Sequence, residues 1–328
     1  MGVKNAILAV DIGGTKTLFQ LSNEQDHIIL ETEYVSQNFS SFDLVLTAFL
    51  QQKELADYAV SRACFAVSGP VTGRDATVTN LPWELNADSL ANDFSISHVH
   101  LCNDFEAVGY GISCLADDEI IILQKGKPIK GAPRAVIGAG TGLGQALLLP
   151  DGEHWKVVAT EGGHTDFSPT NTLQIALLSY LMTQFEHVSH ERIVSGVGLV
   201  SIYDFLCDYH RCDHNKELHD AMKNADPAAI ISHYALEGHD DIASEALDLF
   251  VQIYGSQAGN LALTVLPRAG LYIAGGIAEK NLSRFQNGQF IEHFVAKGKM
   301  KSLMMTLPIY LILQAKVGLM GARILAQR

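Results

Sequence analysis

The 328-residue sequence lacks three features that would place it in common functional classes. It has no apolar run approaching the roughly 20 residues that cross a bilayer. Its 23 basic residues are outnumbered by 36 acidic ones, and a formal net charge of −13 repels nucleic acid and anionic membranes. It has no Walker-type lysine motif, which excludes a P-loop fold. Any nucleotide bound by so acidic a chain is expected to arrive with a divalent cation.

The first residues do not predict a targeting segment. MGVKNAILAVD holds one lysine and a short apolar run that stops at Asp11, unlike a signal peptide. Ala6 stands where the myristoylation pattern requires Ser or Thr. With 48% hydrophobic and 18% charged residues, the composition is that of a globular protein. We therefore expect a soluble, cytoplasmic protein without nucleic-acid or membrane partners.

The sequence has only five cysteines, an odd number. Cys64 and Cys102 lie in apolar, strand-like runs, where free thiols behave as small hydrophobic groups. The stretch CDYHRCDH suggests a zinc site, but structural zinc sites usually take paired ligands from two separate segments. We favour a polar helix end with incidental metal ligands at Cys207, His210, Cys212 and His214.

Hydrophobic patterns predict a similar succession of elements in the two halves. In the first half, strands are expected over 5–12, 17–22 and 27–34, before helical periodicity over 41–55. A buried strand over 61–70 and another that ends at Asn103 follow, and a helix begins at Asp104. In the second half, strands over 134–140, 142–150 and 155–161 precede helices over 173–186 and 242–266, a strand over 270–277, a strand over 307–314 and a helix over 318–327. A twofold repeat of a β-meander followed by β-α units is the simplest description.

Three glycine-rich turns follow predicted strands. DIGGT at 11–15 is either a plain hairpin turn or a phosphate-binding loop, since glycines allow backbone N–H groups to approach an anion. Asp11 is placed to hold a water on a magnesium ion. GAGTGLG at 138–144 resembles a Rossmann fingerprint, but that motif opens a helix and a strand follows here. A hairpin with Thr141 at its tip can still hold phosphates. With IAGGI at 273–277, these turns suggest one cleft.

Polar pairs mark the ends of several predicted elements. They are Thr-Asn at 79–80, Asn-Asp at 103–104, Glu-Gly-Gly-His at 161–164 and His-Glu-Arg at 190–192. Carboxylates, amides and an imidazole bind neutral polyols through paired donors and acceptors. Each pair alone has a structural explanation, for example Asn103 as a helix N-cap. Together they indicate a polyol site.

The order and spacing of these stretches resemble the bacterial-type glucokinase family. The matching segments are VDIGGT, VTNLPW, NDFEAVGYGI, GAGTGLGQA, EGGHTDFSP, HERIVSGVGL, LYIAGGIA and LPIYLIL…GLMGA. The resemblance implies an α/β, actin-like (ribonuclease H-like) fold with a duplicated core and an inter-domain cleft. Residues 1–110 with 315–328 would form the small domain and 111–314 the large one. It also implies a homodimer.

Matched position by position, the resemblance implies ATP-dependent phosphorylation of D-glucose to glucose 6-phosphate. Asp104 would be the general base that takes the proton from the sugar 6-hydroxyl, and would also cap its helix. The side chains implied to bind the sugar are Asn80, Asn103, Asp104, Glu161, His164 and Glu191. Mg-ATP would be held by Asp11, Ile12, Gly13, Gly14, Thr15, Gly140, Thr141, Gly142, Gly275 and Gly276, with Asp11 reaching Mg²⁺ through a water.

One segment departs from the family pattern. Many members follow GGT with Asn and then Arg two residues later, whereas this chain has Lys16, Thr17 and Leu18. GGTK is similar to the ROK branch of sugar kinases and repressors, but the cysteine-rich zinc motif of that branch is absent after His164. Two other functions stay open: a kinase for another hexose, and a sugar-sensing regulator without turnover.

Overall fold

The computed structural model describes residues 4–152 and 154–328. The chain divides into two compact units. Unit 1 contains the residues up to Asp117, residues 157–159 and residues 314–328, and unit 2 contains residues 118–156 and 160–313. Both units are built on a mixed β-sheet.

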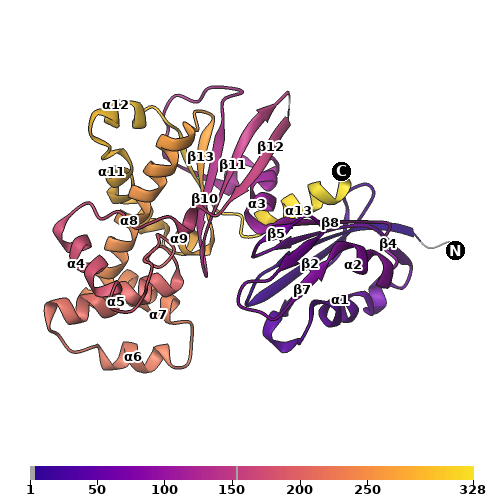
Figure 1. The fold of residues 1–328 in the computed structure, drawn as a ribbon, viewed down its shortest axis with the longest axis horizontal. Helices are drawn as coiled ribbons and strands as arrows, with labels where there is room; N and C mark the ends of the chain where they lie inside the picture. The colour runs from indigo at the N-terminus through magenta and orange to yellow at the C-terminus, as the bar shows by residue number, and fades with distance from the viewer. Residues whose placement is uncertain (1–3, 153) are drawn as a thin grey trace. The chain divides into compact units, whose positions relative to one another are not determined.

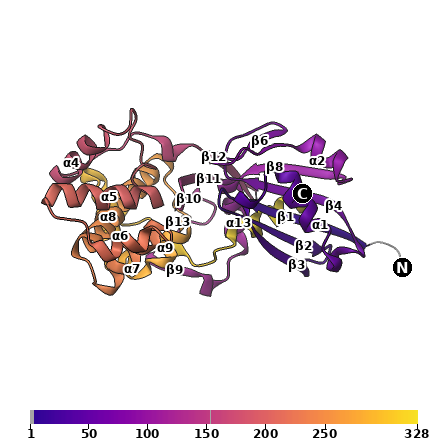
Figure 2. The ribbon, with the colours of Figure 1, turned by 90° about the horizontal axis from the view of Figure 1, so that it is seen from below.

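Unit 1 contains a five-stranded sheet in the order β3-β2-β1-β4-β8, which can be followed in Figure 2. The strand β1 pairs antiparallel with β2 and parallel with β4, and β4 pairs parallel with β8. A smaller sheet has the order β5-β6-β7. The strands are β1 (Lys4–Ile12), β2 (Lys16–Asn23), β3 (Ile28–Val35), β4 (Tyr58–Val67), β5 (Val71–Thr72), β6 (Asp75–Thr77), β7 (Glu84–Asn86) and β8 (His98–Asn103).

Helices cover both faces of the five-stranded sheet (Figure 1). On one face, α1 (Phe42–Leu50) and α2 (Ala87–Asp93) pack on a core rich in aromatic side chains. On the other, α3 (Asp104–Gly111) and α13 (Val317–Gln327) pack over alanines and cysteines. These two helices approach so closely that a Cβ on Gly321 would lie 1.7 Å from the Ala107 carbonyl oxygen.

The sheet of unit 2 has the order β12-β11-β10-β13-β14-β9. As in unit 1, a central strand, β10, pairs antiparallel with the strand that follows it and parallel with a later strand, β13, and β13 pairs parallel with β14. The predicted duplication is therefore confirmed, with β9 as an additional antiparallel strand. The strands are β9 (Ile120–Gln124), β10 (Arg134–Ala139), β11 (Leu143–Asp151), β12 (His154–Thr160), β13 (Gly270–Ala274) and β14 (Ile309–Ile312).

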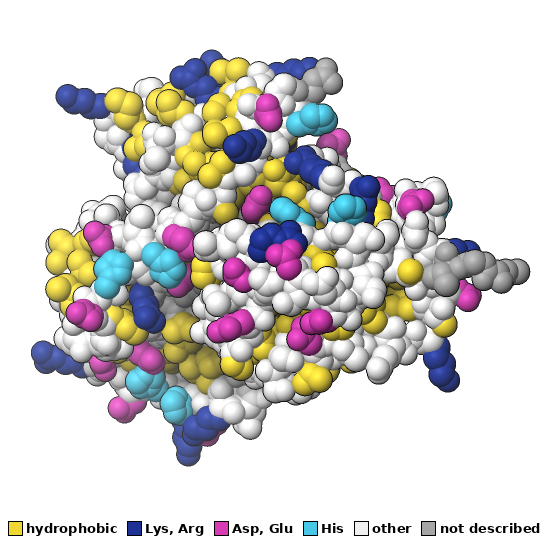
Figure 3. Space-filling view, turned by 45° about the vertical axis from the view of Figure 1, so that its right-hand side comes forward, with side chains coloured by type: hydrophobic (Ala, Val, Ile, Leu, Met, Phe, Trp, Pro, Cys, Tyr) yellow, Lys and Arg dark blue, Asp and Glu magenta, His cyan; other side chains and the backbone are white. Residues whose placement is uncertain are grey.

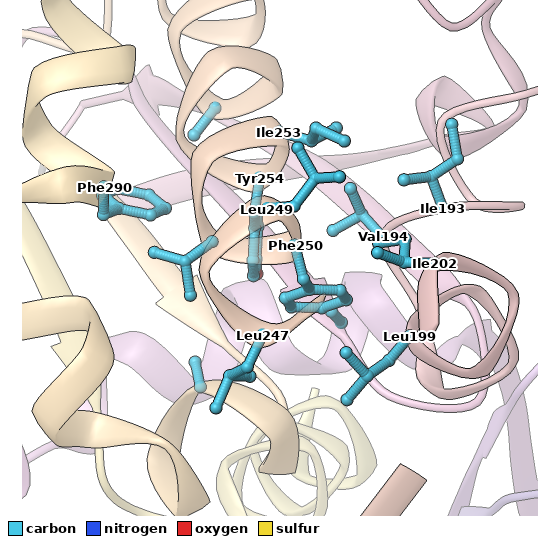
Figure 4. Packing of buried hydrophobic residues seen from close by; sticks show 14 of the residues in the cluster. Ile193, Val194, Leu199, Ile202, Leu247, Leu249, Phe250, Ile253, Tyr254 and Phe290 are labelled. Carbon is cyan, nitrogen blue, oxygen red and sulfur yellow. The ribbon is translucent and has the colours of Figure 1, made fainter. Parts of the chain in front are cut away.

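The longest helix of unit 2, α8 (Asp241–Val265), lies at the centre of its core. Figure 4 shows Phe250 and Tyr254 of α8 among side chains of α5 and α11, including Ile202 and Phe290. The Tyr254 hydroxyl donates a hydrogen bond to the Ile137 carbonyl of β10 (3.2 Å), which ties the helix to the sheet. The other helices are α4 (Thr172–Leu181), α5 (Gly196–His210), α6 (Lys216–Met222), α7 (Pro227–Glu237), α9 (Gly276–Lys280), α10 (Leu282–Gln286), α11 (Gln289–Val295) and α12 (Lys301–Met304).

Two expected helices are shorter than predicted. The helix expected over 41–55 ends at Leu50 and is followed by a 3-10 turn over Lys53–Leu55. The helix expected over 173–186 ends at Leu181. In both cases the hydrophobic period continues past the point where the backbone turns, so the period alone overestimates the length.

The stretch 207–214 contains the end of a helix, as the sequence predicts. The helix α5 ends at His210, and Arg211 follows in the left-handed conformation (φ 54°). His210 lies 2.9 Å from Glu245, and His214 lies 3.2 Å from Asp204. Within residues 4–152 and 154–328, no three His, Cys, Asp or Glu side chains group as a metal site, and no helix there is long and apolar enough to span a membrane.

Candidate active site

Three parallel strands of unit 1 end at the same edge of the sheet. The register pairs Ile12 of β1 with Val67 of β4, and Val67 with Asn103 of β8. Asp11, one residue before the end of β1, and Asp104, just after β8, are therefore brought to one edge although they are far apart in the sequence. Ligands of open α/β sheets bind outside this carboxyl edge.

The glycine turn after β1 is held by a buried hydroxyl pair. The Gly13 N–H donates to the Lys16 carbonyl (2.9 Å) and closes the hairpin. The Ser36 hydroxyl donates to the Gly13 carbonyl (2.8 Å) and lies 3.0 Å from the buried Thr17 hydroxyl. Lys16 pairs with Glu33 of β3 at 2.6 Å. Lys16 and Thr17, which depart from the family pattern, thus anchor the turn to its own sheet through Glu33 and Ser36. No local sequence signal marks Ser36 as a supporting residue.

Asn80 lies beside this turn. The Ser68 N–H donates to the Ile12 carbonyl (3.0 Å), and the Thr79 N–H donates to the Ser68 carbonyl (2.9 Å). A Cβ on Gly14 would stand 3.3 Å from the Thr79 carbonyl oxygen and 3.7 Å from the Asn80 Cβ. Asn80 itself is exposed and has a positive φ of 66°. The backbone therefore places Asn80 at the edge where the turn lies.

Asn103, and not Asp104, is the N-cap of α3, which corrects the expectation that Asp104 caps its helix. The Asn103 side-chain oxygen accepts from the Phe105 N–H (2.9 Å), and its side-chain nitrogen donates to the Gly69 carbonyl (3.2 Å). Asp104 is the first helical residue and is half-buried; its carboxylate also accepts from the Phe105 N–H (2.9 Å). A helix N-terminus stabilises such a carboxylate anion.

Asp11 is the most perturbed carboxyl group of this edge. Burial raises the pKa of Asp11 from its ordinary 3.8 to about 7, and the nearby Asp104 carboxylate adds to the rise. The N-terminal turn of α13 contributes to this burial, because a Cβ on Gly318 would lie 3.1 Å from the Asp11 carboxylate. Two carboxyl groups so close together favour either a shared proton or a cation.

In unit 2, two glycine turns meet at the ends of β10 and β13. The register pairs Gly138 with Ala274, and a Cβ on Gly275 (φ 89°) would stand 2.3 Å from the Ala139 carbonyl oxygen. A Cβ on Gly140 or Gly276 would instead meet nothing within 4 Å. Packing therefore does not require glycine at these two positions, and their backbones are open to an approaching ligand. Thr141, at the hairpin tip, is exposed.

Glu161, His164 and Glu191 gather next to that hairpin. The Glu191 carboxylate accepts from the Leu143 N–H (2.9 Å) and lies 3.8 Å from one ring nitrogen of His164. The other ring nitrogen lies 3.8 Å from the Glu161 carboxylate. His164 and Glu191 also line a hollow of about 360 Å³, to which Glu186, His187 and Arg192 contribute. Two carboxylates around an imidazole provide the donors and acceptors that a polyol needs.

The loop that carries Glu161 and His164 rests directly on β11. A Cβ on Gly163 would lie 2.0 Å from the Leu143 carbonyl oxygen, and one on Gly162 would lie 2.4 Å from the Gln145 side-chain oxygen. Gln145 is buried beneath the loop. It is a second supporting residue without a sequence signal, because its role depends on a strand pairing. The predicted residues thus form two groups, one in each unit.

Comparison with known proteins gives a consistent result. The model of the glucokinase family matches residues 8–328. A glucokinase from Nostoc sp. is 43% identical over 98% of this chain and 99% of its own length, and one from Synechocystis sp. is 41% identical over 99% and 98%.

Solved structures show the same fold. Glucokinase from an Antarctic psychrotroph has a TM-score of 0.80 at 29% identity, covering 98% of both chains. Glucokinase from Balamuthia mandrillaris, solved with glucose, has a TM-score of 0.85 at 24% identity, covering 99% of this chain and 94% of its own. A ROK-family glucokinase from Streptomyces griseus, solved with glucose and AMPPNP, has a TM-score of 0.64 at 20% identity, covering 98% and 99%.

The raised pKa of Asp11 predicts a defined pH dependence of stability. Between its ordinary value of 3.8 and about 7, the folded chain keeps a proton on Asp11 that the unfolded chain has lost, so the free energy of unfolding falls as the pH rises. Asp11→Asn removes this loss and should gain about 1–3 kcal/mol relative to wild type across that range, less than the full shift because Asp11 is partly exposed. Urea unfolding at several pH values measures the difference.

The control for this experiment is Asp57→Asn, an exposed position of the same unit. Its unfolding free energy should follow the wild-type curve. An Asp11→Asn curve parallel to wild type over the whole range would contradict the assignment of a proton to Asp11.

Proposed function

The chain belongs to the glucokinase family, and on this basis we propose that it transfers the terminal phosphoryl group of ATP to the 6-hydroxyl of D-glucose, giving glucose 6-phosphate and ADP. The observation that carries the proposal is the placement of Asp104 at the carboxyl edge of unit 1, beside a glycine turn that suits phosphate. Phosphoryl transfer needs positioning and charge stabilisation more than covalent chemistry.

In this proposal Asp104 is the general base. Its carboxylate, at the N-terminus of α3, accepts the proton of the sugar hydroxyl as that oxygen attacks phosphorus. By the resemblance to the family, the side chains that bind the remaining hydroxyls are those of Asn80, Asn103, Glu161, His164 and Glu191. The His164 ring, between two carboxylates at 3.8 Å, supplies a donor where Glu161 and Glu191 supply acceptors.

The glycine turns bind the nucleotide. The turn Gly13–Thr15 follows Asp11 and Ile12, and the hairpin Gly140–Gly142 lies with Gly275 and Gly276 at the corresponding edge of unit 2. Open backbone at Gly140 and Gly276 fits a ligand that approaches the main chain closely.

Asp11 suits magnesium carried in with ATP. Its carboxyl oxygens are hard ligands of the type that Mg²⁺ prefers, usually with retained waters, and a cation would relieve the repulsion between Asp11 and Asp104. Bound Mg²⁺ neutralises charge on the phosphates during transfer. The residues present therefore fit Mg-ATP, with Asp11 reaching the ion through a water.

We also propose that the enzyme works in the cytoplasm as a homodimer, without nucleic-acid or membrane partners. All five cysteines are free, which is typical of a reducing compartment. Ile175 of α4 and Met182, which follows the end of α4, expose 54% and 66% of their surfaces, as side chains at a subunit contact do in an isolated chain.

Asp104→Asn tests the general-base role. The amide keeps the size of the side chain but cannot take a proton, so kcat should fall by about 10²–10⁴ while glucose binding remains measurable by calorimetry. Asp241→Asn is the matched control, because Asp241 is also the first residue of a helix. It is exposed and belongs to unit 2. Turnover retained in Asp104→Asn would rule out the base assignment. Glucose binding without turnover in the wild-type protein would favour the sugar-sensing alternative.

Glu161→Gln tests the sugar-binding role of unit 2. Replacing a carboxylate by an amide removes a charged acceptor, which should raise KM for glucose about ten-fold or more with a smaller effect on kcat. Glu245→Gln serves as the control, because the Glu245 carboxylate contacts His210, whereas that of Glu161 lies near His164. Steady-state kinetics at saturating ATP distinguishes the two parameters, and an unchanged KM in Glu161→Gln would contradict the role.

A further inference from the structure

A second cluster of ionisable side chains lies at the other end of β4 and β8, away from Asn103. Arg62 of β4 pairs in register with His98 of β8, and Cys64 pairs with His100. Because side chains alternate along a strand, Arg62, His98 and His100 face the same side of the sheet as Cys64. This is the side on which α3 and α13 pack.

The two helices leave this end of the sheet open. A hollow of about 370 Å³ remains there within unit 1, lined by Arg62, His98, His100, Glu106, Tyr110 and Arg328. Its size lies within the usual range for small-molecule sites, roughly 300–1,000 Å³. Leu325 and Ala326 add apolar surface to its wall.

The guanidinium groups at the hollow are held in place. Arg62 donates to the Gln327 carbonyl (2.7 Å), and the Arg328 guanidinium lies 4.4 Å over the Tyr110 ring. Just outside, Arg74 donates to the Val99 carbonyl (3.2 Å) and pairs with Asp88 at 2.6 Å. Each of these contacts uses only part of an arginine's five donors.

The local charge of the hollow opposes that of the chain. Burial lowers the pKa of His100, and the positive charge of Arg74 lowers it further. Glu106 is the one acidic side chain among the lining residues, and burial raises its pKa. The chain as a whole carries −13, and Figure 3 shows acidic side chains distributed over the face it presents. Two guanidinium groups against one carboxyl group favour an anionic ligand in this hollow.

We propose that this hollow binds a phosphate group, either free or carried by a small phosphomonoester such as a sugar phosphate. Arginine forks match phosphate oxygens in pairs, and two guanidinium groups suit a dianion better than a single carboxylate. Tyr110 and Leu325 offer the apolar surface against which a sugar ring packs. The site is distinct from the Asp104 edge, and the proposal does not depend on the proposed function.

The test is an NMR titration of the full-length protein that follows the imidazole signals of His98 and His100. His98→Gln and His100→Gln assign the two signals, and the probes are sodium phosphate and glucose 6-phosphate. Both signals should shift and saturate. Because the signals report on the hollow alone, binding of a probe elsewhere is not counted.

Arg62→Gln should weaken phosphate binding at least about ten-fold, since a charged hydrogen-bond donor is lost. Arg62→Lys should restore part of the affinity. Lys53→Gln, an exposed cation of the same unit, should leave it unchanged. Thermal unfolding of each variant checks that the fold is retained.

Tighter binding of glucose 6-phosphate than of phosphate would identify a phosphomonoester as the ligand, and equal binding would identify phosphate alone. Shifts no larger than those caused by sodium chloride at the same ionic strength would overturn the proposal. So would equal affinity in wild type and Arg62→Gln. The outcome of this titration does not depend on whether the protein has kinase activity.

Discussion

Parallel strand pairing is the constraint on which both groups of candidate residues depend. In unit 1 it aligns the ends of β1, β4 and β8, so that Asp11 and Asp104 meet across nearly a hundred residues of sequence. In unit 2 it aligns β10 with β13, so that the hairpin at Thr141 lies beside Gly275. The duplicated strand order produces the same kind of edge twice, and each edge carries one glycine turn after its central strand. One repeated structural unit thereby provides the two sheet edges at which a phosphate donor and a polyol acceptor could bind.

The edge of unit 1 is held in an electrostatically unfavourable state. Burial and a second carboxylate raise the pKa of Asp11 to about 7, which costs stability near neutral pH. The burial comes partly from α13. This helix lies close because the glycines at its crossing with α3 have no side chains to hold the two helices apart. Perturbed carboxyl groups of this kind are concentrated at functional sites, where a bound cation or substrate offsets the cost. The tight crossing of α3 and α13 therefore contributes to the raised pKa of Asp11.

Much of this architecture could be predicted from the sequence, because strands and glycine turns leave local signals. The apolar run in 5–12 and the glycines at 13–14 place the first edge without any structure. Residues 196–237 could not be assigned, since α5 and α7 carry apolar residues on several faces and are defined by packing on α8. The sequence favours both Asn103 and Asp104 as the N-cap of α3, because both residue types cap helices and only the backbone geometry separates them. Ser36, Gln145 and Gly318 support the site through contacts between distant segments, which a single sequence does not reveal.

The central claim is that this chain phosphorylates glucose at the expense of Mg-ATP. The most direct test is ADP release from ATP and magnesium with glucose, mannose, fructose and N-acetylglucosamine, each with and without EDTA. The account predicts that ADP appears with glucose, that EDTA abolishes it, and that fructose and N-acetylglucosamine react far more slowly. A faster reaction with another hexose would contradict the substrate assignment, and glucose binding without ADP release from any sugar would contradict the claim that the protein is a kinase.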